Sequence, residues 1–251
     1  MFRSSVAQIK EERKTKTTLN DRTDIVIFGS WLIKLKSEGI RWLLHYLFKE
    51  SYEFAEWNPE TKNHWYAEKS ILKELNPLVT IPYIKSGETV VSQIGAIMVA
   101  LCLKAKRKDL MGVSKEDAVR VRAIQSSVQD LRNIVWSALD MSRDEFAVAY
   151  RERMRRQIDG IVGRLDGQLR SQGGEFMLEY LTIADFDVAH AVDTYDWFCN
   201  QVGIEDPFTS FHNLRNLVKE VKKLDRVEAY ISSPSATSMP YIEKKSSVLL
   251  G

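Results

Sequence analysis

The period of the hydrophobic positions changes near residue 107 of this chain. Before that point, short apolar runs typical of strands alternate with stripes of apolar residues at helical spacing. After it, apolar residues recur three and four positions apart, as on one face of a helix. We therefore expect a mixed α/β domain at residues 23–106 and an all-helical domain at 107–232, with polar tails at 1–22 and 233–251.

The first half of the α/β domain has the pattern of a β-α-β unit. Residues 24–28 form a mostly apolar run and residues 52–56 alternate, so both are expected to be strands. The segment that starts at Ser37 carries its apolar residues on one face and is expected to be a helix. A connection of this length predicts parallel pairing and a right-handed crossover. A second helix is expected at residues 64–75.

Residues 76–106 predict a hairpin followed by a helix. A β-type run at residues 80–85 is interrupted by Pro82, which indicates a sheet edge, a bulge or a cis peptide bond. Gly87 suits the turn of a hairpin, and residues 89–91 are expected to form its second strand. An apolar helix then opens at Gln93, and helix N-termini favour anions. The order β-α-β-α-β-β-α is that of a thioredoxin-like domain.

Three capping boxes mark helix starts in the second domain. In each, a hydroxyl side chain precedes a carboxylate by three positions, beginning at Ser114, Ser142 and Thr182. Gly-Gly and Asp-Pro pairs mark the breaks between helices. The expected helices span residues 115–140, 144–171, 182–201, 212–224 and 226–232.

Composition and charge narrow the range of partners. Of the 251 residues, 44% are hydrophobic and 28% are charged, as in ordinary globular proteins. A net charge of +2 gives no electrostatic reason to expect a nucleic-acid partner. No apolar run reaches the ~20 residues that a membrane span needs. No metal is expected either, because the histidines lack the spacing of metal ligands; they are His45, His64, His190 and His212.

The cysteines and the N-terminus bear on the compartment. Cys102 and Cys199 both lie in apolar helical patterns, so a disulfide framework is not supported and a reducing compartment such as the cytoplasm is expected. The first ten residues contain arginine, serines and alternating apolar positions, as in a transit peptide. A mitochondrial location is therefore the alternative.

Short motifs along residues 24–232 resemble the glutathione transferases, and most closely their mu class. The likeness lies in the order and spacing of the motifs. They are Gly29-Ser30-Trp31 before Ile40-Arg41, Trp65 with Lys69, Ile81-Pro82-Tyr83-Ile84, Gln93 before an apolar helix, the capping box within 181–186, and the final helices within 211–230. The resemblance implies the glutathione transferase fold, in which a thioredoxin-like domain precedes an all-α domain, with glutathione as the co-substrate.

The resemblance also implies how glutathione would be held. The implied binding residues are Trp31, Trp65, Lys69, Ile81, Pro82 and Gln93. In this family, residues like Trp65 and Lys69 meet the glycine carboxylate of glutathione. The backbone of Ile81, beside Pro82, would pair with the cysteinyl unit, and Gln93 would hold the γ-glutamyl end.

Two serines are candidates for activating the glutathione thiol. A free thiol titrates near ~8.5, so a hydroxyl donor must stabilise the thiolate at neutral pH. Ser30 occupies the position of the mu-class tyrosine, although its shorter side chain places the hydroxyl farther back. Ser37, four residues before Arg41, matches the serine of the theta and delta classes; alternatively, it only caps the following helix.

Three positions depart from the mu-class pattern. Ile94 replaces a serine that bonds the γ-glutamyl carboxylate, and Arg122 replaces an acid lent by the partner subunit. Leu78 replaces the aromatic residue that the family inserts into its dimer partner, so a homodimer and protein partners in a larger complex are both compatible with the sequence. We expect a transferase-like pseudoenzyme that serves as a structural or docking subunit. The alternative is an active, divergent glutathione transferase that conjugates glutathione to an electrophile, with Ser30 or Ser37 as the thiol activator.

Overall fold

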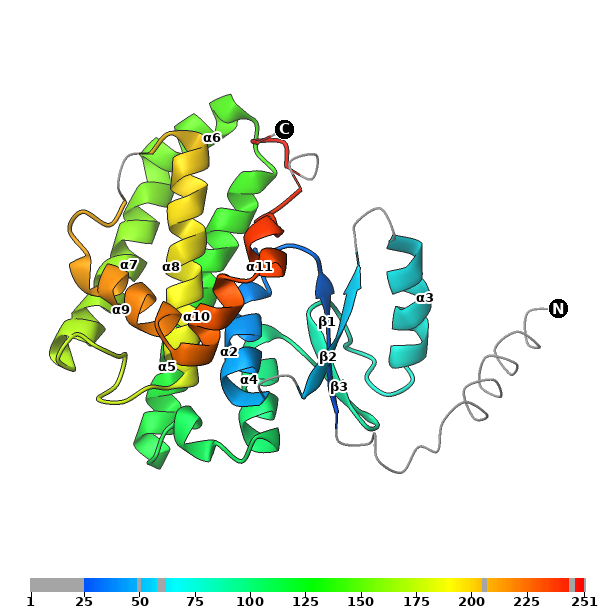
Figure 1. Cartoon of the computed structure of the whole chain (residues 1–251). Coiled ribbons are helices and arrows are strands. Elements are labelled where there is room, and N and C mark those ends of the chain that lie inside the picture. The colour runs from blue at the N-terminus through cyan, green and yellow to red at the C-terminus, as the bar shows by residue number, and fades with distance from the viewer. Residues whose placement is uncertain (1–24, 49–50, 58–61, 205–206, 244–246, 251) are drawn as a thin grey trace, which may run out of the picture.

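The computed structural model describes residues 25–48, 51–57, 62–204, 207–243 and 247–250. A sheet with helices on both faces occupies one side of the molecule, and a bundle of helices occupies the other (Figure 1). This arrangement confirms the predicted fold class, a thioredoxin-like domain followed by an all-helical domain. The tail predicted at residues 1–22 lies outside the described residues.

The sheet has four strands in the order β2-β1-β3-β4. β1 (Val26–Trp31) pairs in parallel with β2 (Tyr52–Trp57), as the length of the connection predicts. β3 (Tyr83–Ser86) pairs antiparallel with β1 and with β4 (Thr89–Ser92), so the predicted hairpin is present. Since β3 begins opposite the last residues of β1, the loop after β1 and the loop before β3 meet at one end of the sheet.

Two strand boundaries differ from the prediction. β1 continues to Trp31 instead of ending at residue 28, because its last residues pair with β2 as far as Trp57. β3 begins at Tyr83 instead of residue 80, because Pro82 has no backbone N–H to give to the sheet ladder. The peptide bond between Ile81 and Pro82 is cis, which is one of the three options that the sequence leaves open.

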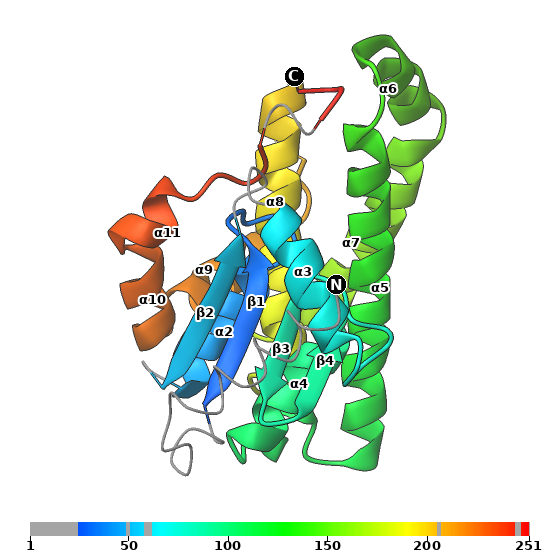
Figure 2. The same cartoon turned by 90° about the vertical axis from the view of Figure 1, so that its right-hand side faces the viewer.

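The helices of the α/β domain lie on both faces of its sheet. α2 (Glu38–Phe48) and α4 (Ile94–Lys104) lie on the side toward the helical domain, and α3 (Lys62–Leu72) covers the opposite face (Figure 1, Figure 2). Ile40 and Leu44 of α2 are fully buried, as the predicted apolar face requires. α2 and α4 are therefore the elements through which the sheet packs on the helical domain.

The helical domain follows the predicted periodicity closely. Its helices are α5 (Lys115–Leu139), α6 (Arg143–Ala149), α7 (Arg155–Ser171), α8 (Ile183–Val202), α9 (His212–Lys222), α10 (Asp225–Ile231) and α11 (Pro234–Ser238). A π-helical turn at Tyr150–Met154 joins α6 to α7, so the helix predicted at 144–171 is continuous but irregular. A 3-10 turn at Lys108–Met111 links α4 to α5. In the part of the chain that the structure describes, no helix is both long and apolar enough to cross a membrane.

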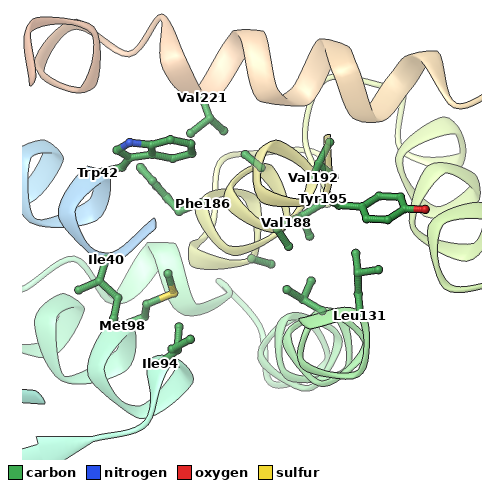
Figure 3. Close-up of a cluster of buried hydrophobic side chains, with 14 of the residues drawn as sticks. Ile40, Trp42, Ile94, Met98, Leu131, Phe186, Val188, Val192, Tyr195 and Val221 are labelled. Carbon is green, nitrogen blue, oxygen red and sulfur yellow. The ribbon is translucent and has the colours of Figure 1, made fainter. Parts of the chain in front are cut away.

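α8 lies at the centre of the helical domain. Figure 3 shows Phe186, Val188, Val192 and Tyr195 of α8 among side chains of the surrounding helices. Each of these four side chains is at most 2% exposed. Their neighbours belong to α2, α4, α5 and α9, so one continuous hydrophobic core unites the two domains.

The C-terminal residues, predicted as a tail, pack against the body of the protein where the structure describes them. The backbone N–H of Lys34 donates to the carbonyl of Pro240 (2.9 Å), and that of Leu35 donates to the carbonyl of Tyr241 (3.1 Å). The ring of Tyr241 stacks on Trp197, with 4.8 Å between the ring centroids. The C-terminal segment therefore supports the loop between β1 and α2.

Two of the predicted capping boxes are complete but differ in burial. At the start of α8, the carboxylate of Asp185 is fully buried and accepts from the backbone N–H groups of Thr182 (2.6 Å) and Met177 (2.6 Å). At the start of α6, the exposed carboxylate of Glu145 accepts from the N–H of Ser142 (2.8 Å). Burial raises the pKa of Asp185 to about 6, although the hydrogen bonds that it accepts act to lower it.

We expect Asp185→Asn to destabilise the protein much more than Glu145→Gln. The amide turns one acceptor into a donor, so at least one buried N–H opposite Asp185 loses its partner, at a cost of about 1–3 kcal/mol. At the exposed capping box of α6, water can supply the hydrogen bond that Glu145→Gln loses. Urea unfolding of the two variants measures the difference in the free energy of unfolding. Equal shifts of the two midpoints would contradict the role assigned to burial.

Candidate functional site

A cavity of about 310 Å³ lies where the loop after β1 meets the segment before β3. Its lining residues come from the β1–α2 segment, from α3 and from the chain around the cis peptide bond. They are Trp31, Ile33, Leu35, Lys36, Ser37, Trp65, Thr80, Ile81 and Pro82. The sheet topology thus brings together three segments that are distant in the sequence.

Most of the residues predicted for the site line this cavity. These residues are Trp31, Ser37, Trp65, Ile81 and Pro82. The other predicted residues, Ser30, Lys69 and Gln93, do not belong to its lining. The lining therefore includes Ile81 and Pro82, expected at the cysteinyl unit, and Trp65, expected at the glycine end, but it lacks Gln93, expected at the γ-glutamyl end.

Ser30 lies inside the protein and does not face the cavity. Its side chain is 0% exposed, and its hydroxyl donates to the carbonyl of Trp31 (2.8 Å). The same hydroxyl accepts a hydrogen bond from Nη2 of Arg41 (2.7 Å). A serine hydroxyl has one proton to donate, and here a backbone carbonyl receives it. This placement disfavours Ser30 as the donor to a thiolate in the cavity.

Arg41 is the centre of a buried polar cluster. Its guanidinium donates to the carbonyls of Trp31 (2.9 Å) and Ile33 (3.1 Å). It also pairs with Glu38 (3.3 Å) and Glu56 (3.0 Å). Burial raises the pKa of Glu38, and the charge of Arg41 opposes that rise. Through the two carbonyls, Arg41 fixes the start of the loop that lines the cavity.

Ser37 lines the cavity immediately before α2. Its backbone carbonyl accepts from the N–H groups of Ile40 (3.1 Å) and Arg41 (3.0 Å), so its main chain begins the helix. Ser37 is only 2% exposed, but it belongs to the cavity lining, together with Ile81 and Pro82. Of the two candidate serines, Ser37 has the placement needed to touch a ligand in this cavity.

Lys36 lines the same cavity and is not among the residues predicted from the sequence. Its Nζ lies 3.6 Å from the centroid of the Trp136 ring on α5. Lys36 is exposed overall, but partial desolvation lowers its pKa. No local pattern distinguishes it from the many lysines of surface loops. Only the folded structure, which brings the loop to the cavity, places Lys36 in the lining.

Trp65, which lines the cavity, packs against two further aromatic rings. The ring of Trp65 lies 5.3 Å from that of Trp57 and 5.8 Å from that of Tyr83, measured between centroids. Nζ of Lys69 lies 5.8 Å from the centroid of Trp65. Lys69 is therefore close to the cavity without lining it.

The first turn of α4 has a cation from α5 beside it. Gln93, which precedes α4, is exposed and has a φ of 74°, while Ile94 is buried. Nη1 of Arg122 donates to the carbonyl of Gly95 (3.2 Å) and to the side-chain oxygen of Gln125 (2.8 Å). The guanidinium thus binds within its own chain, next to the segment predicted to hold the γ-glutamyl end.

Other nucleophilic and metal-ligating side chains lie away from the cavity lining. Cys102 and Cys199 are buried, and burial raises the pKa of each thiol to about 12, so neither is a reactive nucleophile. Burial also lowers the pKa of His45 to about 4 and that of His190 well below its usual value. Among the described residues, no three or more His, Cys, Asp or Glu side chains gather as they would around a metal ion.

Comparison with known sequences indicates one family. The family model described as the glutathione S-transferase C-terminal domain matches residues 129–234. Glutathione S-transferase Mu 4 of Mus musculus is 25% identical over 223 residues, which cover 86% of this chain and 94% of that protein. Glutathione S-transferase Mu 3 of Homo sapiens is 24% identical over 229 residues, which cover 87% and 93% respectively.

Solved structures have the same fold over both domains. A pi-class glutathione S-transferase of Onchocerca volvulus matches with a TM-score of 0.69 and 16% identity, covering 87% of this chain and 97% of that one. The glutathione S-transferase Blo t 8 matches with a TM-score of 0.70 and 20% identity, covering 90% and 100%. At these identities the likeness concerns the fold alone.

We expect Arg41→Met to lower the free energy of unfolding by about 3–5 kcal/mol, because Glu38 and Glu56 lose the cation that compensates their burial. Arg120→Met is the matched control. Arg120 is 61% exposed and lies 3.8 Å from Asp117, so its loss should cost less than about 0.5 kcal/mol. Unfolding in guanidinium chloride, followed by tryptophan fluorescence, measures both variants. A shift for Arg41→Met no larger than that of the control would refute the central role of this cluster.

Proposed function

The chain belongs to the glutathione S-transferase family, and from this premise we propose that it binds glutathione in the cavity beside the β1–α2 loop and conjugates it to a small electrophile. The observation that carries the proposal is the presence of Ser37, Ile81 and Pro82 in one cavity. Ile81 precedes the first residue of β3, so the sheet ladder of β3 does not use its backbone. That backbone suits pairing with the cysteinyl unit of a peptide.

Conjugation needs a thiol that is ionised at neutral pH. Because a free thiol titrates near ~8.5, the site must stabilise the thiolate. The hydroxyl of Ser37 would donate a hydrogen bond to the sulfur anion. The sulfur then forms a bond to the electrophilic carbon. The bond between that carbon and its leaving group breaks, and its electron pair departs with the leaving group.

A second candidate function is that of a docking subunit without catalysis. Ser30 is engaged by Arg41, Ile94 offers no hydroxyl, and Arg122 brings a cation to the first turn of α4. The last two features weaken the hold on a zwitterionic γ-glutamyl end, through a lost hydrogen bond and through like charge opposite its ammonium. In this alternative the chain contributes its fold and surface to a larger assembly.

We expect Ser37→Ala to lower kcat about 10²–10³-fold while the affinity for glutathione stays close to that of the wild type, because one donor to the developing charge is lost. Ser127→Ala, on α5 and outside the cavity lining, is the matched control and should keep full activity. Calorimetry with glutathione and an absorbance assay with a reactive aryl halide measure the two quantities. A wild-type protein that neither binds glutathione nor turns over would favour the docking subunit.

We also propose that Leu78 lies in a homodimer interface. Its side chain is 82% exposed, in a loop that is held rigidly to the sheet. Asn76 holds this loop, since its side chain accepts from the N–H of Leu78 (2.9 Å) and donates to the carbonyl of Val90 (3.0 Å). A rigid loop that presents an apolar tip suits insertion into a second copy of the chain.

Leu78→Asp should therefore convert a dimer into a monomer, because a charge at the tip of the loop would lose its hydration on insertion. Light scattering coupled to size-exclusion chromatography measures the mass. Val148→Asp on α6, where the valine is 44% exposed, is the control and should leave the dimer intact. A Leu78→Asp protein with the mass of the wild-type dimer would place the interface elsewhere.

A further inference from the structure

We propose that the ammonium group of Lys36 holds the sulfur of a bound thiol ligand in its anionic form. The inference rests on the proposed function and assigns to the same cavity a second group, a cation next to the hydroxyl of Ser37. Three features of the structure support it: the composition of the cavity lining, the contact with Trp136, and the anchoring of the loop.

Among the described residues that line the cavity, Lys36 is the one with a charged side chain. The remainder of the lining is aromatic, aliphatic or hydroxyl-bearing. An anion in the cavity therefore meets one positive group among uncharged side chains. The lysine itself is exposed, so water screens part of its charge. A thiol, which becomes anionic when it ionises, is the kind of ligand that such a cation would favour in its ionised form.

The ring of Trp136 determines where the ammonium lies. The 3.6 Å between Nζ of Lys36 and the ring centroid is within the range of a cation–π contact. Such a contact holds the cation by the ring quadrupole and leaves its net charge intact, whereas a carboxylate partner would neutralise it. The ammonium is thus positioned and still available to an anion.

The backbone around Lys36 is anchored on both sides. The N–H groups of Lys34 and Leu35 donate to carbonyls of the C-terminal segment, and Arg41 holds the carbonyl of Ile33. On its other side, the chain enters α2 directly. Because the loop is fixed before a ligand arrives, little conformational entropy is lost when the ammonium meets the ligand.

Two buried carboxylates on neighbouring helices, Glu38 and Asp187, have cationic partners of their own. Glu38 pairs with Arg41, and Asp187 pairs with Arg132 at 2.6 Å. Burial, and no neighbouring charge, is the cause of the lowered pKa of Lys36. Further charged groups on the surrounding elements are Lys34 in the same loop, Asp140 just after α5, Asp193 on α8 with its partner Lys222 on α9, and Glu243 in the C-terminal segment.

In the proposed step the thiol S–H bond breaks and its proton passes to water or to a buffer base. The electron pair stays on sulfur, which then faces the ammonium of Lys36 and accepts a hydrogen bond from Ser37. A cation beside a thiol lowers the thiol pKa below its usual ~8.5. The thiolate is then ready for the substitution described above.

Charge removal at Lys36 tests the inference on the full-length protein. In Lys36→Met, the pKa of protein-bound glutathione, followed by the ultraviolet absorbance of the thiolate, should rise by about one unit or more. Lys36→Arg keeps the charge and should stay close to the wild type. Lys108→Met, which removes an exposed lysine outside the cavity, is the matched control and should leave the thiol pKa unchanged.

S-methylglutathione separates stabilisation of the thiolate from general binding, because it has no thiol to ionise. Its affinity, measured by calorimetry, should be unchanged in Lys36→Met. Turnover of that variant should fall about tenfold at a pH below the thiol pKa and recover at high pH, as a shift of one unit requires.

Three results would overturn the inference. The first is an unshifted thiol pKa in Lys36→Met, and the second is an equal loss of affinity for glutathione and S-methylglutathione. The third is a wild-type protein that binds neither compound, which would remove the proposed function as well. If glutathione binds but its thiol pKa is unshifted in Lys36→Met, the role of Lys36 is refuted and the proposed function stands. If Lys36→Met does not fold, Lys36→Gln decides by the same measurements.

Discussion

The buried guanidinium of Arg41 is the interaction on which the candidate site depends. A buried charge is stable only when its donors and its charge are satisfied, and Arg41 achieves this with carboxylates, carbonyls and the hydroxyl of Ser30. These partners belong to β1, β2, α2 and the loop between β1 and α2. The hydrogen bonds of Arg41 thus hold the loop beside the cavity and also occupy the hydroxyl of Ser30 inside the protein, while Ser37 lines the cavity.

The cavity also depends on the helical domain, which packs against the sheet through α2. The shared core around α8 fixes the orientation of α2, and the C-terminal segment adds backbone hydrogen bonds to the loop that precedes it. Trp136 of α5 reaches the ammonium of Lys36 across the boundary between the two domains. The chain thus combines the glutathione transferase fold with residues that differ from the mu-class pattern at several positions.

Much of the fold could be predicted because its signals are local. Capping boxes at Ser142 and Thr182 mark real helix starts, since a hydroxyl and a carboxylate three residues apart satisfy N–H groups within one turn. Motif resemblance identifies Trp65, Ile81 and Pro82, which line the cavity. Strand ends were less predictable, because pairing with a neighbouring strand decides them, as β1 shows by continuing to Trp31.

By itself, the sequence determined the order of the elements, the two domains and the likeness to glutathione transferases, since periodicity, caps and the cis-proline segment act over a few residues. Only the tertiary structure shows that Ser37 and Lys36 line the cavity and that Ser30 does not. Ser30 and Ser37 are both hydroxyls near the first helix, and what separates them is a guanidinium eleven positions from Ser30. Lys36 joins the cavity lining and contacts Trp136 only in the folded chain. A local pattern cannot predict either, because both depend on contacts between segments far apart in the sequence.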